Sequence, residues 1–190
     1  PEILKGCHYK GGFDCVAIYL RNNPESRFFS KKGLILGGSH SPSPLNSEAH
    51  QGDLSAVLLQ NLNPLVNLIR VPKKPIILMD EWESKIKAIV DNTWNKDVNS
   101  LSGVPSWMLV LIKAVLKKTG REYLTDVWPN LEVFFRGGIS FEPYREQYKT
   151  LIPSNKMHYM ETYNASEGFF GLQDDPTDPS LLMSPDCCIF

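Results

Sequence analysis

Cysteine is scarce in this 190-residue chain, and the four that occur form no recognisable metal or disulfide pattern. Cys7 and Cys15 lie near the start, whereas Cys187 and Cys188 are adjacent near the end. Neither a zinc-ligand spacing nor a disulfide framework results, so the sequence predicts that the protein is located in the reducing cytoplasm. The four histidines also form no spaced pair that would suit a metal ion.

An excess of one charge and long apolar runs are missing as well. The 20 basic and 21 acidic residues nearly balance, so no broad electrostatic field favours nucleic acid or an anionic membrane surface. The longest apolar run, residues 107–112, is far too short to span a bilayer. No targeting segment, internal repeat or low-complexity tract is visible. The sequence therefore predicts no nucleic-acid partner and no membrane partner.

Helical and strand patterns alternate along the chain, which predicts an α/β fold with a mostly parallel or mixed sheet flanked by helices. Asp80 and Glu83 resemble a capping pair at the start of the clearest helix, and Gly120 stands where a helix commonly ends. A serine- and proline-rich stretch, residues 39–47, is expected to be a loop. The expected helices span residues 13–20, 53–62, 80–95, 105–119 and 142–151, and the expected strands span residues 34–36, 131–135 and 157–162.

The last two strands and the helix between them form a predicted βαβ unit of about thirty residues. The two strands should then be parallel, so that their carboxyl ends meet at one edge of the sheet. Open α/β sheets bind ligands at that edge. Gly137 and Gly138 leave from the first strand, and their lack of side chains would let backbone N–H groups approach a base or a phosphate.

The segment after the second strand carries an aromatic ring, a hydroxyl and a carboxylate. Tyr163 could stack on a flat base, Ser166 could bond a phosphate oxygen, and Glu167 could hold magnesium, which prefers oxygen ligands. Plainer interpretations stand beside these: a half-buried tyrosine, a serine in a turn, and a carboxylate at a helix N-terminus. Gly137 and Gly138 could likewise form an ordinary turn.

Several motifs in this order resemble the Gretchen Hagen 3 (auxin-responsive) acyl acid amido synthetases of bacterial type, within the adenylate-forming enzymes. The Tyr-x-x-Ser-Glu sequence that starts at Tyr163 is similar to the family's second nucleotide motif, and the segment around Gly137, Gly138 and Tyr144 is similar to its adenine loop. Residues 101–108 resemble its acyl-pocket segment. Residues 8–10, 33–39 and 182–190 also occur in the expected order, so the resemblance covers nearly the whole chain.

The resemblance implies ATP-dependent activation of a carboxylic acid to an acyl-adenylate, followed by transfer to an amine such as that of an amino acid. It implies magnesium at Glu167 and a small-molecule acid and amine as partners. The implied nucleotide-binding residues are Gly137, Gly138, Tyr163, Asn164 and Ser166. The implied acyl-binding residues are Val104, Pro105, Trp107 and Met108, although spacing alone would place Trp107 and Met108 in the core.

The chain departs from the family pattern in one important respect. The family's phosphate loop, which is rich in Ser, Thr and Gly and ends in lysine, does not occur; residues 37–41 are the nearest run and are interpreted as a structural turn. We therefore expect residues 1–190 to be part of a large N-terminal adenylation domain, without the phosphate-loop segment and the C-terminal domain, that does not turn over alone. A non-catalytic or degenerate α/β nucleotide-binding domain and an acyl-thioester ligase remain as alternatives.

Overall fold

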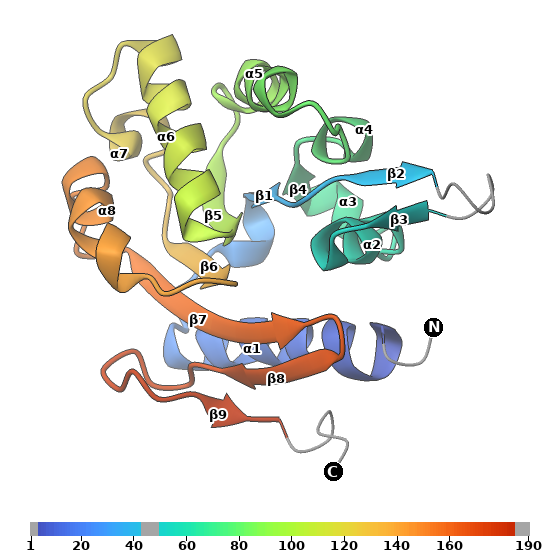
Figure 1. Cartoon of the computed structure of the whole chain (residues 1–190). Coiled ribbons are helices and arrows are strands. Elements are labelled where there is room, and N and C mark those ends of the chain that lie inside the picture. The colour runs from blue at the N-terminus through green and yellow to red at the C-terminus, as the bar shows by residue number, and fades with distance from the viewer. Residues whose placement is uncertain (1–3, 43–49, 185–190) are drawn as a thin grey trace.

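The computed structural model describes residues 4–42 and 50–184, and its centre is a mixed sheet of seven strands (Figure 1). The strands β4, β1, β5, β6 and β7 lie in this order and pair in parallel. Strand β8 pairs antiparallel with β7 on one side and with β9 on the other. This arrangement confirms the predicted α/β class. The strand order is β4 (Arg70–Val71), β1 (Lys32–Leu36), β5 (Val98–Gly103), β6 (Val133–Gly137), β7 (His158–Ala165), β8 (Gly168–Leu172) and β9 (Leu182–Met183).

Helices cover both faces of the sheet (Figure 1). One face is covered by α1 (Lys10–Asn22), which continues directly from the π-helix η1 (Leu4–Tyr9). The main core lies on the other face, under α5 (Trp82–Thr93), α6 (Pro105–Thr119) and α8 (Arg145–Leu151). The remaining elements are short: α2 (Leu54–Gln60), α3 (Val66–Ile69), α4 (Lys74–Ile77), α7 (Leu124–Val127), η2 (Phe28–Ser30), η3 (Glu142–Tyr144), and the β2 (His40–Pro42) and β3 (His50–Gly52) hairpin.

The two helices with the strongest apolar patterns match their predictions closely. Helix α6 begins at Pro105 and ends before Gly120, whose φ of 66° is the left-handed conformation that favours glycine. Helix α5 is capped by Glu81 rather than by the expected Asp80, because the Glu81 carboxylate accepts hydrogen bonds from the N–H groups of Glu83 and Ser84. Ile89 of the predicted apolar face is fully buried, but Trp94 at the helix end is 41% exposed.

The predicted βαβ unit is confirmed as β6, η3 with α8, and β7. Its second strand is longer than expected, because β7 continues to Ala165 and turns back through Ser166 and Glu167 into β8. Strand β8 is held there by Phe169 and Leu172, which pack with Cys15 of α1. The segment after β7 is thus a hairpin and not an open loop, and the interpretation of Glu167 as a carboxylate at a helix start is wrong.

Two further differences concern segments without a clear sequence pattern. Part of the stretch expected to be a loop forms β2, which pairs with β3, while residues 43–49 lie outside the described part of the chain. Strand β5 was not predicted, although it lies inside the sheet, between β1 and β6. Within residues 4–42 and 50–184, none of the helices has the length and apolar character needed to cross a bilayer.

Candidate nucleotide and acyl site

A cavity of about 550 Å³ lies where β1, β5, β6 and β7 reach their carboxyl ends. Its wall is mostly apolar and comes from segments far apart in the sequence: the η1–α1 region, α2, the start of α6, and the β7–β8 hairpin. Parallel strands place ligand sites at this edge of a sheet, so the cavity lies where the sequence predicted a site.

Five of the predicted site residues line this one cavity. They are Gly137 and Gly138 after β6, Val104 and Trp107 at the start of α6, and Asn164 near the end of β7. Gly137, Gly138 and Asn164 were predicted to contact nucleotide. Val104 and Trp107 were predicted to contact the acyl group. Residues assigned to two different ligands thus line one cavity, as a site for both would require.

The two glycines are required by the packing at the end of β6. A Cβ atom on Gly137 would lie 2.6 Å from the carbonyl oxygen of Thr162 in β7, closer than real Cβ contacts allow. Gly138 has a φ of +84°, which side chains rarely adopt, and a Cβ there would lie 3.4 Å from Cγ2 of Val104. The glycines therefore join the predicted nucleotide loop closely to both neighbouring strands.

Three predicted nucleotide and metal residues lie on the hairpin that borders the cavity, but not among the residues that line it. Tyr163 is 54% exposed and packs against the ring of Phe170, with ring centroids 5.4 Å apart. Ser166 and Glu167 form the exposed turn at the hairpin tip. Their neighbours Asn164 and Phe169 in the same hairpin do line the cavity.

Two predicted acyl-wall residues are part of the core. Met108 is fully buried among the helices and strands of the main cluster. Pro105 is buried too, and its carbonyl oxygen accepts a hydrogen bond of 2.8 Å from the hydroxyl of Tyr148. This contact ties the start of α6 to α8, and so fixes the part of the wall that carries Val104 and Trp107.

The sequence did not reveal the contribution of the N-terminal segment. His8, Tyr9, Gly12 and Cys15 line the cavity from η1 and α1. Burial lowers the pKa of the His8 imidazole and raises the pKa of the Cys15 thiol to about 12, so both side chains favour their neutral forms. The π-helical backbone of η1 is an uncommon conformation, and no pattern in the sequence predicts it.

The turn after β1 also borders the cavity through Gly37. Lys85 of α5 is buried, and its Nζ donates to the carbonyl oxygens of Gly37 and Gly38 at 2.7 and 2.9 Å. The hydroxyl of Ser55 accepts from the N–H of Gly38 at 2.8 Å. Contacts from α5 and α2 thus hold the turn, and its interpretation as structural stays a prediction.

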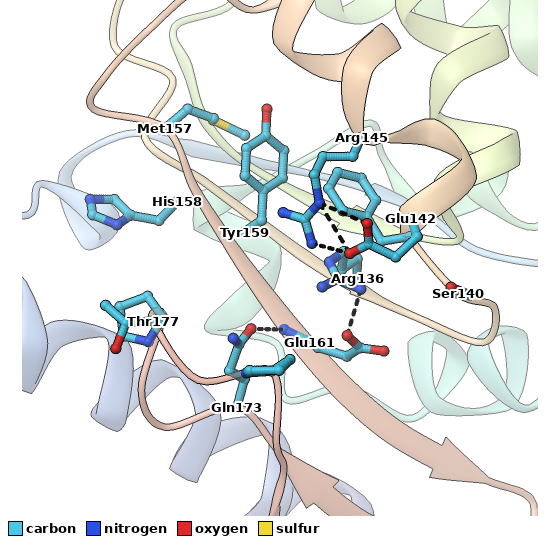
Figure 2. A pocket seen from close by; sticks show the side chains of 13 residues that line it. Arg136, Ser140, Glu142, Arg145, Met157, His158, Tyr159, Glu161, Gln173 and Thr177 are labelled. Carbon is cyan, nitrogen blue, oxygen red and sulfur yellow. Dashed lines mark hydrogen bonds and ion pairs between the residues drawn. The ribbon is translucent and has the colours of Figure 1, made fainter.

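A second cavity, of about 400 Å³, lies beside β6 and β7 near α8 (Figure 2). Its polar wall contains two ion pairs, Arg136 with Glu161 and Arg145 with Glu142. The Phe141 ring packs against both guanidinium groups, at 4.4 Å from Arg136 and 5.3 Å from Arg145. Burial lowers the pKa of Arg136, although the neighbouring Glu161 opposes that shift.

Glu167 offers a single exposed carboxylate to a metal ion. Residues 4–42 and 50–184 contain no group of three or more His, Cys, Asp or Glu side chains that could hold a metal ion. Magnesium commonly takes one or two carboxylates and completes its coordination with phosphate oxygens and water. At Glu167, magnesium would therefore need phosphate oxygens and water as its other ligands.

Comparisons with known proteins agree with this architecture. The family profile described as the GH3 family N-terminal domain matches residues 5–157. Among solved structures, the GH3.15 acyl acid amido synthetase superposes with a TM-score of 0.69 and 14% sequence identity, over 98% of this chain. The chain spans 42% of the length of that protein. No curated protein sequence gives a significant match.

Proposed function

The chain belongs to the GH3 family, and from this premise we propose that it forms the central part of the adenylation domain of an ATP-dependent acyl acid amido synthetase. The enzyme would activate a carboxylic acid as its acyl-adenylate and release pyrophosphate. The acyl group would then pass to an amine, such as that of an amino acid. The similar solved structure carries the name of such a synthetase.

The observation that carries this proposal is the meeting of nucleotide and acyl residues at one cavity. Gly137, Gly138 and Asn164 would contact the nucleotide, and Val104 and Trp107 would contact the acid, because all five line the same cavity. Activation requires the carboxylate to lie next to the α-phosphate, so two separate cavities would not serve.

The hairpin residues have proposed roles beside the cavity. Tyr163 would stack on adenine and Ser166 would approach the α-phosphate. Glu167 would hold magnesium, which when bound neutralises phosphate charge during adenylation. Pro105 and Met108 would support the acyl wall from the core. A cytoplasmic location remains a prediction from the cysteine pattern.

The test uses the full-length protein that contains this chain, in an assay of acid-dependent exchange between ATP and labelled pyrophosphate. Glu167→Ala should reduce exchange to background, because one carboxylate ligand of the metal would be lost, while the fold is retained. Glu25→Ala changes an exposed carboxylate in the turn after α1 and serves as the control. Unchanged exchange in Glu167→Ala would refute the metal role.

A panel of acids distinguishes the proposed function from its alternatives. Amide products with an amino acid support a synthetase, whereas products formed only with a thiol acceptor support a thioester ligase. ATP binding without exchange for any acid tested would indicate a non-catalytic nucleotide-binding domain. Absence of both binding and exchange would refute the proposed function.

A further inference from the structure

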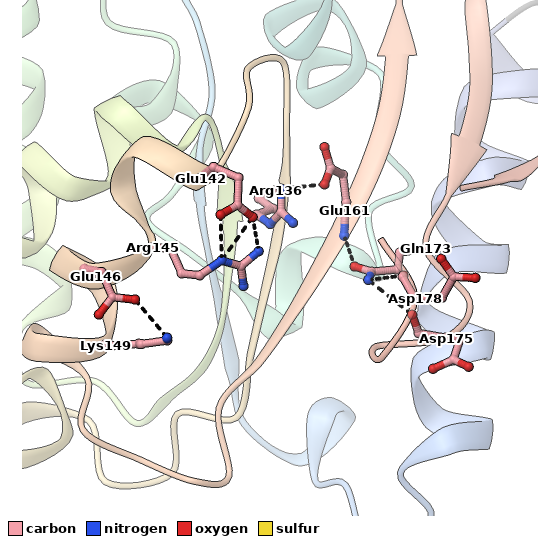
Figure 3. Close-up of polar contacts among 9 residues, drawn as sticks. All are labelled: Arg136, Glu142, Arg145, Glu146, Lys149, Glu161, Gln173, Asp175 and Asp178. Carbon is pink, nitrogen blue, oxygen red and sulfur yellow. Dashed lines mark hydrogen bonds and ion pairs between the residues drawn. The ribbon is translucent and has the colours of Figure 1, made fainter. Parts of the chain in front are cut away.

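We propose that the Arg136–Glu161 ion pair positions the nucleotide loop, and that Arg136 is therefore a positioning residue for ATP binding. This inference rests on the proposed function. It concerns two residues that the motifs of the sequence did not indicate. Figure 3 shows the pair between β6 and β7, beside the separate Arg145–Glu142 and Lys149–Glu146 pairs.

In this pair the arginine is buried and the glutamate is half-buried. The Nη1 atom of Arg136 lies 2.8 Å from Oε2 of Glu161, and the Arg136 side chain is 5% exposed. The Nε atom of Arg136 is also buried and makes no hydrogen bond to a described residue. Burying charges in this way is costly, and apolar side chains of similar volume would commonly give equal or better stability. A role in holding a particular geometry explains the pair better than stability does.

The position of the pair in the chain connects it to the site. Arg136 immediately precedes Gly137, and Glu161 lies two residues before Tyr163. Arg136 and Glu161 are also direct partners in the parallel register of β6 and β7, followed by Gly137 and Thr162. The ion pair therefore joins the two strands one position before their last pair, Gly137 with Thr162, and so lies next to both predicted nucleotide segments.

The backbone at this point leaves little room for movement. The hydroxyl of Thr162 donates to the carbonyl oxygen of Arg136 at 3.2 Å, and Gly137 has no space for a Cβ atom against Thr162. The guanidinium of Arg136 also stacks 4.4 Å from the Phe141 ring, after the glycine loop. Through its side chain Arg136 contacts Glu161 of β7 and the ring of Phe141, which follows the glycine loop, so Arg136→Met would remove both contacts and leave the loop held by backbone contacts alone.

The proposal predicts that loss of the ion pair affects the binding of ATP and the binding of the acid differently. The loop of Gly137 and Gly138 is predicted to contact nucleotide, whereas Trp107 of the acyl wall belongs to α6, which Tyr148 anchors separately through Pro105. Loss of the ion pair should therefore weaken ATP binding much more than acid binding. A change that only weakened the fold would affect both substrates alike.

The experiment measures KM for ATP and KM for the acid in the exchange assay, on the full-length protein, with thermal unfolding of each variant. We expect Arg136→Met to raise KM for ATP by about 10-fold, with less than about 3-fold change in KM for the acid. Glu161→Gln, which keeps the shape of the side chain, should give a smaller change of the same kind.

The exposed Lys149–Glu146 pair of α8 provides the matched control, because its atoms are also 2.8 Å apart. Lys149→Met should leave both KM values unchanged. The charge-exchanged double variant Arg136→Glu with Glu161→Arg should recover part of the ATP affinity lost in Arg136→Met. Recovery together with an ATP-selective effect supports the proposal.

Two results would overturn it. One is an unchanged KM for ATP in folded Arg136→Met or, if that variant does not fold, in Glu161→Gln. The other is an equal rise in both KM values that follows the loss of thermal stability. A wild-type protein that binds no ATP would instead refute the proposed function, and this inference with it, so the two failures are distinguishable.

Discussion

Burial in the wall of the cavity changes the reactivity of single side chains, and the thiol of Cys15 is the clearest case. Cys15 is 3% exposed, and burial raises the pKa of its thiol to about 12. Because the thiolate is the reactive form, we expect alkylation of Cys15 at pH 8 to be about 1000-fold slower in the folded protein than in urea. Peptide mass spectrometry after a timed iodoacetamide reaction measures this ratio.

Cys7 is the internal reference for that experiment, because it lies in η1, directly before the cavity residue His8, and is only partly buried. Folding should slow its alkylation much less than that of Cys15. Equal rates at the two cysteines in the folded protein would contradict the packing of α1 on β8.

Some site residues could be predicted from the sequence because their chemistry is local. A pair of glycines between a strand and a helix indicates a close approach of the backbone, and Gly137 indeed has no space for a side chain. His8 and Cys15 gave no such signal. Their part in the cavity depends on how α1 lies across the sheet, which is a long-range packing property, and a lone histidine or cysteine on a helix has no local pattern that reveals it.

At the scale of elements, the contact of α1 with β8 can be tested with two neighbouring glycines. A Cβ atom on Gly11 would lie 2.3 Å from the ring of Phe169, whereas a Cβ on Gly12 would have no neighbour within 4 Å. Gly11→Ala should therefore lower the free energy of unfolding by about 1–3 kcal/mol through overpacking. Gly12→Ala should raise it by about 0.5–1 kcal/mol, because alanine is the better helix former.

Urea denaturation of both variants measures these changes, and each variant is the control for the other. The two substitutions differ only in the side of the helix that receives the methyl group. Equal effects would show that α1 does not lie on Phe169 as described.

The elements that were predicted correctly have strong local signals. Helix α6 has a proline at its start, a continuous apolar sequence and a glycine after its last turn. The β7–β8 hairpin was missed because its turn residues, Ser166 and Glu167, lack the Asn-Gly or Asp-Gly signal that commonly marks a two-residue turn. Strand β5 was missed because polar Asn99 and Ser100 interrupt its apolar pattern, although both are buried in the sheet.

At the scale of the whole molecule, ligand binding to the cavity should stabilise the folded protein. A ligand that binds only the native state adds about 2.7 kcal/mol at a free concentration 100 times its Kd. We therefore expect ATP with magnesium to raise the thermal unfolding temperature of the full-length protein, and we expect EDTA to remove most of that rise. Differential scanning calorimetry over a series of ATP concentrations measures both effects.

The same calorimetric measurement separates the stabilisation that depends on magnesium from the stabilisation by ATP alone. If Glu167 holds magnesium, Glu167→Ala should lose the magnesium-dependent part of the stabilisation and keep the smaller effect of ATP alone, because Gly137, Gly138 and Asn164 are unaltered at the cavity. Glu25→Ala should behave as the wild type. A magnesium effect of equal size in Glu167→Ala would show that the metal depends on other ligands, and the hairpin turn would then have no direct part in binding it.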